Sequence, residues 1–133
     1  MNKIEHIGIA VKNLDETEKI YSKLFGTTSY KREKVESEGV ITSFFKIGNS
    51  KIELLAATDY KSPIHKFIEK HGAGMHHIAF EVEDIVKELK RLESEGFVLI
   101  NKLPKSGADD KLVAFLHPKS TDGVLIEICQ EKK

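Results

Sequence analysis

The chain has 133 residues, of which 40% are hydrophobic and 32% are charged, a composition typical of a folded globular protein and not of a disordered one. The 21 Lys and Arg residues balance the 21 Asp and Glu residues, which argues against the broad basic surface of a nucleic-acid-binding protein. Cys129 is the only cysteine, so an intrachain disulfide scaffold is excluded, and no apolar run approaches the roughly 18 residues that suggest a membrane-spanning helix.

The first half of the chain is predicted to contain a strand, a helix and three more strands. Residues 4–11 are rich in Ile and Val, as strands are, and no signal or transit peptide precedes them, which favours the cytoplasm. An amphipathic helix is predicted over 14–25, with Asn13 as its N-cap and Gly26 just past its end. Its packed side is expected to carry Leu14, Ile20, Tyr21 and Leu24. Strands are expected near 28–36, 39–47 and 50–57.

The second half of the chain is predicted to repeat this order after a short connecting helix over 63–71, which Ser62 and Pro63 begin. A helix is expected over 85–95, with Asp84 as its N-cap and Gly96 at its end. Strands are expected near 76–82, 97–102, 112–117 and 123–130. The segment 104–110 has no periodicity and is predicted to be a mobile loop.

Two segments recur along the chain in the same order. Residues 6–11 (HIGIAV) resemble residues 77–82 (HIAFEV), 71 positions later, and residues 51–55 (KIELL) resemble residues 125–129 (LIEIC), 74 positions later. This repetition predicts two homologous β-α-β-β-β modules, and hence the α+β fold class. We expect one domain over 1–133, with module one at about 1–60, a connecting helix at about 61–72 and module two at about 73–133.

Each module places one histidine and one glutamate at matching positions of its strands. Because side chains alternate between the faces of a strand, His6 and His77 share a face with small residues and lie opposite the bulky apolar ones. Glu53 and Glu127 each interrupt an apolar stretch, where burying a lone charge is costly. Two imidazoles and two carboxylates suit a divalent transition metal, so the repeat predicts a metal site with positions left open for water or substrate.

Other candidate ligands fit this site less well. His76 is expected to point to the opposite face of its strand from His77, because the two residues are neighbours. Cys129 shares a face with Glu127 and is interpreted as part of a cavity wall and not as a ligand. His117 precedes Pro118 at the end of a strand, where a structural role and a place at the rim of the site are equally consistent with the pattern.

The sequence resembles the vicinal-oxygen-chelate (glyoxalase/bleomycin-resistance) superfamily over essentially its whole length, and within it the methylmalonyl-CoA epimerases. The segments that carry this resemblance are 5–11, 48–55, 62–64, 74–82 and 113–120, the last leading to 123–127. The resemblance implies two paired modules whose sheets form an open barrel around a metal. It also implies that His6, Glu53, His77 and Glu127 are the metal ligands.

The resemblance further implies an isomerase that interconverts (2R)- and (2S)-methylmalonyl-CoA through an enolate. Glu127 matches a proposed base of the family as well as a ligand, whereas Thr42 stands where some epimerases carry a glutamate, so the second acid–base group is left open between Glu38 and a water molecule. The family suggests Co²⁺, although Zn²⁺, Ni²⁺ or Mn²⁺ also suit such ligands. A homodimer is expected by analogy.

The acyl-CoA substrate is expected to contact Thr42, Lys119 and Ser120, the last two inside the epimerase-like segment. Lys105 and Lys111 flank the loop 104–110 and offer further positive charge for phosphates, and the loop is expected to close over the substrate. Neither a nucleic acid nor a membrane is expected as a partner.

Three other functions share parts of this pattern. Glyoxalase I, a lyase acting on the methylglyoxal–glutathione hemithioacetal, resembles the chain in the four ligands, but the segment 117–120 (HPKS) departs from it. A metal-free binding module has little use for two histidines and two glutamates in apolar surroundings. An extradiol dioxygenase uses two histidines and one carboxylate, so Glu53 is one ligand too many.

Overall fold

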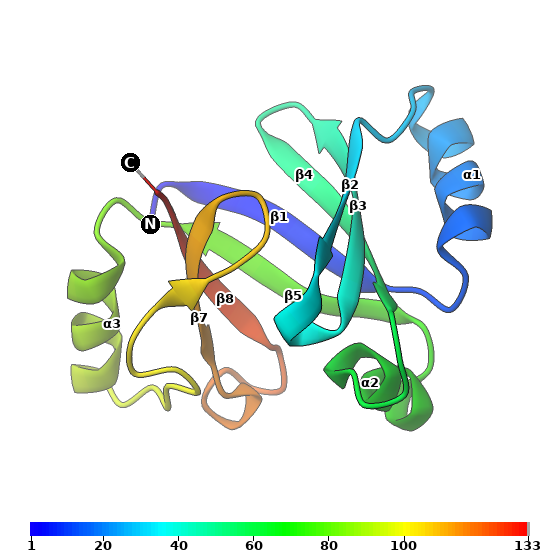
Figure 1. The fold of residues 1–133 in the computed structure, drawn as a ribbon. Coiled ribbons are helices and arrows are strands. Elements are labelled where there is room, and N and C mark those ends of the chain that lie inside the picture. Colours follow the sequence, from blue (N-terminus) through cyan, green and yellow to red (C-terminus); the bar gives the residue numbers. More distant parts are fainter. Residues whose placement is uncertain (133) are drawn as a thin grey trace. The chain divides into compact units, whose positions relative to one another are not determined.

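The structure is a computed structural model that describes residues 1–132, and it has the predicted α+β class (Figure 1). The first half contains β1 (Lys3–Ala10), α1 (Leu14–Phe25), β2 (Lys31–Val35), the 3₁₀ turn η1 (Glu36–Glu38), β3 (Val40–Ile47), β4 (Ser50–Ala57) and α2 (Pro63–His71). The second half contains β5 (Gly74–Glu81), α3 (Ile85–Ser94), β6 (Lys105–Ser106), β7 (Lys111–Leu116), the 3₁₀ turn η2 (Pro118–Ser120) and β8 (Ile126–Glu131). The predicted order β-α-β-β-β therefore occurs twice. Within 1–132, no helix has the length and apolar character needed to cross a membrane.

The chain divides into two compact units, and their boundary does not fall between the two sequence repeats. Unit 1 consists of Met1–His6 and the chain from His77 onward, and unit 2 consists of Ile7–His76. Strands β1 and β5 therefore each give residues to both units. One consequence is that His6 lies in the same unit as His77 and Glu127, although 71 residues separate the two histidines.

Unit 2 is built on the antiparallel strands β2, β3 and β4, with β3 in the middle. The register places Thr42 opposite Glu33 on one side and opposite Leu55 on the other, and Glu53 opposite Phe44. Residues directly opposite in a ladder share a face, so these side chains belong to one face of the sheet. The other face packs against α1 in a hydrophobic cluster of Val11, Leu14, Phe45, Leu54 and Ala56, with Tyr21 and Phe25 against it.

Helix α1 has the predicted bounds, and Asn13 caps it by accepting a hydrogen bond from the Glu16 N–H at 3.0 Å. The predicted packed side is wrong for Ile20 and Leu24, which are 61% and 69% exposed. At about 100° per residue, Tyr21 and Phe25 lie within about 20° of Leu14 around the helix axis, whereas Ile20 and Leu24 lie roughly 80–120° away. The packed stripe is therefore narrower than predicted, and it includes Phe25, which was not predicted to belong to it.

Helix α2 begins and packs as the sequence predicts. The Ser62 side chain accepts a hydrogen bond from the Ile64 N–H at 3.1 Å, and Pro63 occupies the first turn, where its missing N–H costs nothing. Ile64 is buried in a cluster with Ala10 and Leu55. Phe67 and Ile68 pack against the same cluster, so this helix covers one end of the unit 2 sheet.

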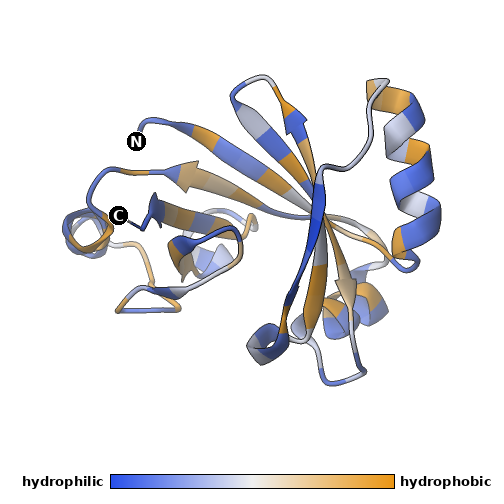
Figure 2. Cartoon of the chain, turned by 45° about the horizontal axis from the view of Figure 1, so that its top comes forward, coloured by the Kyte–Doolittle hydropathy of each residue, from blue (hydrophilic) through white to orange (hydrophobic). Residues whose placement is uncertain are grey.

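Unit 1 is built on β8, which pairs in parallel with β5 and antiparallel with β7. Asp84 caps α3 by accepting from the Lys87 N–H at 3.1 Å, matching the cap of α1 in the first module. The core of the unit joins α3 to β7 and β8 through Val82, Ile85, Leu89, Leu92, Ala114, Leu116 and Ile128. Hydrophobic and hydrophilic residues alternate along the strands, as a sheet with one packed face requires (Figure 2).

Two predictions for the segment between α3 and β7 are wrong. No strand occupies 97–102 as predicted, and the segment makes one isolated bridge, from Leu99 to Leu116. Its apolar residues Phe97 and Leu99 pack against the core of unit 1 instead of forming a ladder. The predicted loop 104–110 contains β6, which pairs with β7. Gly107, the residue after β6, lies against Val113 of β7. A Cβ added to Gly107 would lie 2.8 Å from a methyl carbon of Val113.

Candidate metal centre

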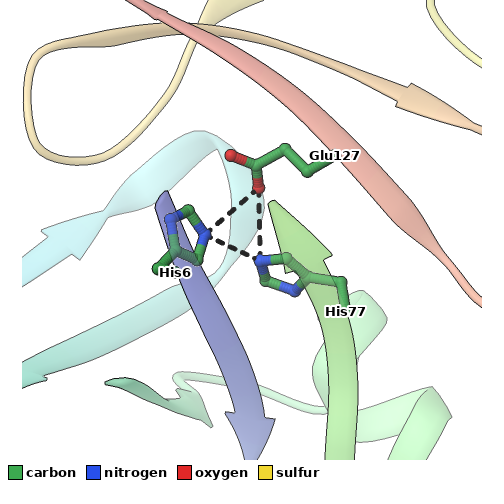
Figure 3. A group of neighbouring side chains, drawn as sticks. All are labelled: His6, His77 and Glu127. Atoms are coloured by element: carbon green, nitrogen blue, oxygen red, sulfur yellow. Dashed lines mark hydrogen bonds and ion pairs between the residues drawn. The ribbon is translucent and has the colours of Figure 1, made fainter. Parts of the chain in front are cut away.

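Three buried side chains meet in unit 1: His6, His77 and Glu127 (Figure 3). The two Nε2 atoms lie 3.0 Å apart, and Oε1 of Glu127 lies 3.6 Å from Nε2 of His6 and 3.2 Å from Nε2 of His77. Each residue is only 5% or 6% exposed. Three of the four ligands predicted from the repeat are thus side by side, and each directs one donor atom to the same point.

The strands explain this convergence. His6 comes from β1, His77 from β5 and Glu127 from β8 (Figure 3). The parallel register of β5 and β8 pairs Ala79 with Glu127, so His77, two residues before Ala79, lies diagonally across from Glu127 on the same face. His76 behaves as alternation predicts, because its ring lies 4.8 Å from the ring of Phe67 of α2, in unit 2.

The carboxylate of Glu127 is held in its charged form. Burial alone would raise its pKa, but hydrogen bonds and charge interactions with His6 and His77 outweigh burial and bring the pKa well below its usual range. Within this cluster Glu127 is therefore an acceptor carrying a negative charge. Its Oε1 faces the two rings, and the second carboxylate oxygen points away from both of them (Figure 3).

The donor atoms fit a divalent transition metal ion. The two imidazole nitrogens and the carboxylate oxygen all lie within 4.8 Å of one another, and imidazole with carboxylate suits Co²⁺, Zn²⁺, Ni²⁺ or Mn²⁺. An ion held by these three would retain positions for further ligands, as catalytic metal sites do. The buried, mutually directed donors therefore match the type of site that the sequence predicted.

The fourth predicted ligand, Glu53, and the predicted substrate contact Thr42 belong to unit 2. Both are buried, at 5% and 1% exposed, and both lie on the face of the β3–β4 ladder that also carries Phe44 and Leu55. Glu53 was predicted to be a ligand because it is a carboxylate between apolar neighbours on a strand. The roles of Glu53 and Thr42 stay predictions.

The predicted substrate-binding residues after β7 lie in the turn η2. Lys119 is exposed, and its backbone N–H donates to Nδ1 of His117 at 3.1 Å. The Ser120 hydroxyl donates to the His117 carbonyl at 2.9 Å and accepts from the Val98 N–H at 3.1 Å. His117 and Ser120 therefore support the turn that presents Lys119, and the contacts of Lys119 and Ser120 with a substrate stay predictions.

Three other residues weighed from the sequence have clear positions. Cys129 is fully buried with Ala79 and Val113, and burial raises the pKa of its thiol well above its usual range, which suits a wall and not a metal ligand. Glu38 lies in η1, before β3 starts at Val40, so it is not on the strand face where it was considered as a base. Lys111 was expected to offer positive charge for phosphates beside the loop 104–110, and its burial, at 5% exposed, contradicts that expectation.

Glu5 was not among the predicted site residues, but it is 2% exposed and its Oε1 lies 2.7 Å from Nδ1 of His6. Alternation along a strand places neighbouring residues on opposite faces and gave no reason to join Glu5 to His6. A usable signal was present: Glu5 is an acidic residue directly beside a predicted ligand, and ligating histidines usually donate their second ring N–H to such a group.

A family model described as the glyoxalase/bleomycin resistance protein/dioxygenase superfamily matches residues 5–115. The chain belongs to this superfamily. It is 42% identical over 129 residues to the mitochondrial methylmalonyl-CoA epimerase of Dictyostelium discoideum, covering 96% of this chain and 78% of the relative. It is 39% identical over 132 residues to the ethylmalonyl-CoA/methylmalonyl-CoA epimerase of Cereibacter sphaeroides, covering 98% of each protein.

A solved structure of a methylmalonyl-CoA epimerase in complex with methylmalonyl-CoA and NH4+ shares this fold with a TM-score of 0.94. That protein is 33% identical to this chain, and the match covers 98% of this chain and 95% of the other. The predicted glyoxalase-type fold and the resemblance to the epimerase family are therefore confirmed. As a member of this family the chain is an enzyme of the isomerase class, as predicted.

Proposed function

We propose that this protein is a metal-dependent epimerase that interconverts (2R)- and (2S)-methylmalonyl-CoA. The observation that carries the proposal is the buried convergence of His6, His77 and Glu127, in a chain that is similar to epimerases over nearly its whole length. We propose methylmalonyl-CoA as the substrate, ahead of ethylmalonyl-CoA. Two relatives are named as methylmalonyl-CoA epimerases and one solved structure contains methylmalonyl-CoA, whereas ethylmalonyl-CoA appears in the name of one relative.

Inversion at C2 of this substrate is a proton-transfer problem. C2 lies between a thioester carbonyl and a carboxylate, so removing its proton gives an enolate whose charge spreads onto the thioester oxygen. Configuration inverts when a proton leaves one face of C2 and another proton arrives on the opposite face. The site therefore needs a proton acceptor, a proton donor and stabilisation of negative charge on substrate oxygen.

Glu127 is assigned the proton transfer on one face of C2. It is ionised in its buried surroundings, as an acceptor must be, and its second oxygen is directed away from His6 and His77. The two histidines and the first oxygen of Glu127 would hold the metal ion, with Glu53 as the fourth ligand. When bound, a divalent ion supplies Lewis-acid stabilisation of charge on the substrate oxygens.

The ligands assigned here come from both sequence modules, His6 and Glu53 from the first and His77 and Glu127 from the second. For this reason we propose that 1–133 act as one functional domain. Lys119 and Ser120 would contact the CoA portion, where the exposed ammonium of Lys119 suits a phosphate. We also propose that the protein is a homodimer and acts in the cytoplasm.

Proton transfer on the opposite face of C2 is assigned to a water molecule, because a threonine hydroxyl such as that of Thr42 is too weak an acid and base to replace a carboxylate. The variant Thr42→Val keeps the shape of the side chain and removes the hydroxyl. If Thr42 only lines the cavity, kcat is expected to change by less than about tenfold, equivalent to about 1.4 kcal/mol. Initial-rate kinetics would measure this, and a loss of several hundredfold would show that the hydroxyl positions the proton carrier.

The function itself is tested by proton exchange at C2. Methylmalonyl-CoA of one configuration is incubated in D₂O with the Co²⁺-loaded protein, and ¹H NMR follows the loss of the C2 proton. The proposal expects deuterium incorporation together with loss of stereochemical purity, and it expects both to stop when a chelator removes the metal. Absence of exchange with the metal-loaded protein would refute the proposed reaction.

Glyoxalase I is kept as the second candidate because the matched family model covers the superfamily as a whole. The same protein preparation is therefore offered the methylglyoxal–glutathione hemithioacetal, and thioester formation is followed by absorbance. The epimerase proposal expects no turnover of this compound. Turnover of the hemithioacetal without exchange at C2 of methylmalonyl-CoA would assign the chain to the lyase.

A further inference from the structure

A buried polar chain lies behind His6, on the side of the ring opposite to His77 and Glu127. Nδ1 of His6 lies 2.7 Å from Oε1 of Glu5, whereas Nε2 of the same ring faces His77 and Glu127. Oε2 of Glu5 lies 4.0 Å from Nζ of Lys111. Glu5 is 2% and Lys111 5% exposed, so both charges are withdrawn from water.

The contact between Glu5 and His6 determines which ring nitrogen carries the proton. An ionised carboxylate only accepts hydrogen bonds, so Nδ1 of His6 must be the donor in the 2.7 Å contact. A metal ion would replace the hydrogen on Nε2, the atom that faces His77 and Glu127, and the neutral ring that binds the ion then keeps its proton on Nδ1. The bond at Nδ1 also fixes the angle of the ring.

Lys111 in turn holds Glu5. Its Nζ lies 3.2 Å from Oε1 of Glu131, with which Lys111 is paired across β7 and β8, and 3.9 Å from Oε1 of Glu81 in β5. One ammonium is therefore surrounded by three carboxylates from three strands. A buried carboxylate left without a charged or hydrogen-bonding partner is costly, and the ammonium of Lys111 is one such partner of Glu5.

We infer that Glu5 and Lys111 are positioning residues of the metal centre: Glu5 fixes the tautomer and orientation of His6, and Lys111 fixes Glu5. This inference rests on the proposed function for the identity of the ion, but the tautomer of His6 does not depend on it. Loss of such an outer partner typically weakens metal binding by about 10–100-fold while leaving every ligand in place. A purely structural ion pair would change the stability of the protein and leave metal affinity unaltered.

Three variants separate these two roles. Glu5→Ala removes the acceptor, and about 10–100-fold weaker Co²⁺ binding is expected. Glu5→Gln keeps an acceptor oxygen but loses the charge, so its affinity is expected between those of Glu5→Ala and the wild type. Lys111→Met keeps an unbranched side chain and removes the ammonium, and a smaller loss is expected. The control is Glu93→Gln, which changes an exposed carboxylate paired with Lys102 on the surface of the same unit, and wild-type affinity is expected for it.

Two readouts are used on the chain 1–133, and neither requires turnover. Isothermal titration gives the affinity for Co²⁺ alone. Long-range ¹H–¹⁵N NMR of the metal-free protein, recorded at a pH at which the His6 ring is neutral, gives its tautomer, which is expected to be the Nδ1–H form in the wild type and to shift toward Nε2–H in Glu5→Ala. Thermal unfolding identifies variants that fail to fold, and if Glu5→Ala is one of them, the wild-type tautomer, Glu5→Gln and Lys111→Met decide the outcome.

These measurements distinguish failure of the proposed metal centre from failure of the positioning role of Glu5 and Lys111. A wild-type protein that does not bind Co²⁺ contradicts the proposed metal centre, and the NMR experiment then still decides whether Glu5 sets the tautomer. A wild-type protein that binds Co²⁺, with folded Glu5 variants of equal affinity, overturns the inference alone. An Nε2–H tautomer of His6 in the metal-free wild type overturns it as well.

Discussion

Glu127→Gln is expected to slow the epimerisation of methylmalonyl-CoA by about 10²–10⁴-fold, the range that loss of one acid–base group covers. The substitution keeps the size of the side chain and an oxygen that can face His6 and His77, but it removes the negative charge that these rings stabilise. Because one carboxylate is assigned both a ligand bond and a proton transfer, Co²⁺ affinity is expected to fall together with kcat. Steady-state kinetics at saturating Co²⁺ and titration of Co²⁺ into the metal-free protein measure the two effects separately.

The control for this prediction is Glu93→Gln, the same chemical change at an exposed carboxylate of unit 1. Its rate and its Co²⁺ affinity are expected to equal those of the wild type. A folded Glu127→Gln protein with full activity would contradict both roles. Weak Co²⁺ binding with a rate that recovers fully at high Co²⁺ would leave Glu127 a ligand and remove its role as the base.

The repeat in the sequence was sufficient to predict most of the fold. Strand, helix and cap recur at matched positions, and the two caps, Asn13 and Asp84, form the predicted hydrogen bonds at the starts of α1 and α3. The clustering of His6, His77 and Glu127 in unit 1 follows from the same repeat, since equivalent positions of related modules carry equivalent side chains. What could be predicted were features that local periodicity and module symmetry determine.

The errors lie where tertiary packing decides. The apolar residues at 97–102 are equally consistent with a strand and with an irregular segment that packs on a core. Phe97 and Leu99 pack against the core of unit 1 and form no strand ladder, which depends on where that core lies. Similarly, Ile20 and Leu24 face solvent because the sheet of unit 2 covers a narrow stripe of α1. Burial of this kind depends on how elements meet, which a single sequence does not state.

The polar chain behind His6 was missed for a related reason. Lys111 stands beside a predicted loop in a chain with 32% charged residues, and the composition favours a solvated lysine. Its burial arises from the pairing of β7 with β8 and from the carboxylates of Glu5 and Glu81, which lie far from it in sequence. Four strands, β1, β5, β7 and β8, must be assembled before this environment exists.

His77→Ala is expected to abolish measurable Co²⁺ binding, a loss larger than the roughly 100-fold that removal of an outer partner causes. The substitution deletes a ligand atom that lies 3.0 Å from Nε2 of His6 and 3.2 Å from Oε1 of Glu127. It also leaves the Glu127 carboxylate with one imidazole in place of two, so its pKa is expected to rise toward its usual range. Titration calorimetry with Co²⁺ checks the first effect, and ¹³C NMR of the metal-free carboxylates checks the second.

The adjacent residue provides the matched control, because His76 and His77 have the same chemistry and differ in the strand face they occupy. His76→Ala removes a ring that packs against Phe67 of α2 at 4.8 Å, so a modest loss of stability and unchanged Co²⁺ affinity are expected. Equal loss of affinity in both variants would mean that any disturbance of β5 destroys the site, and the assignment of His77 as a ligand would lose its support. A loss confined to His77→Ala would instead tie metal binding to one face of one strand, as the repeat predicts.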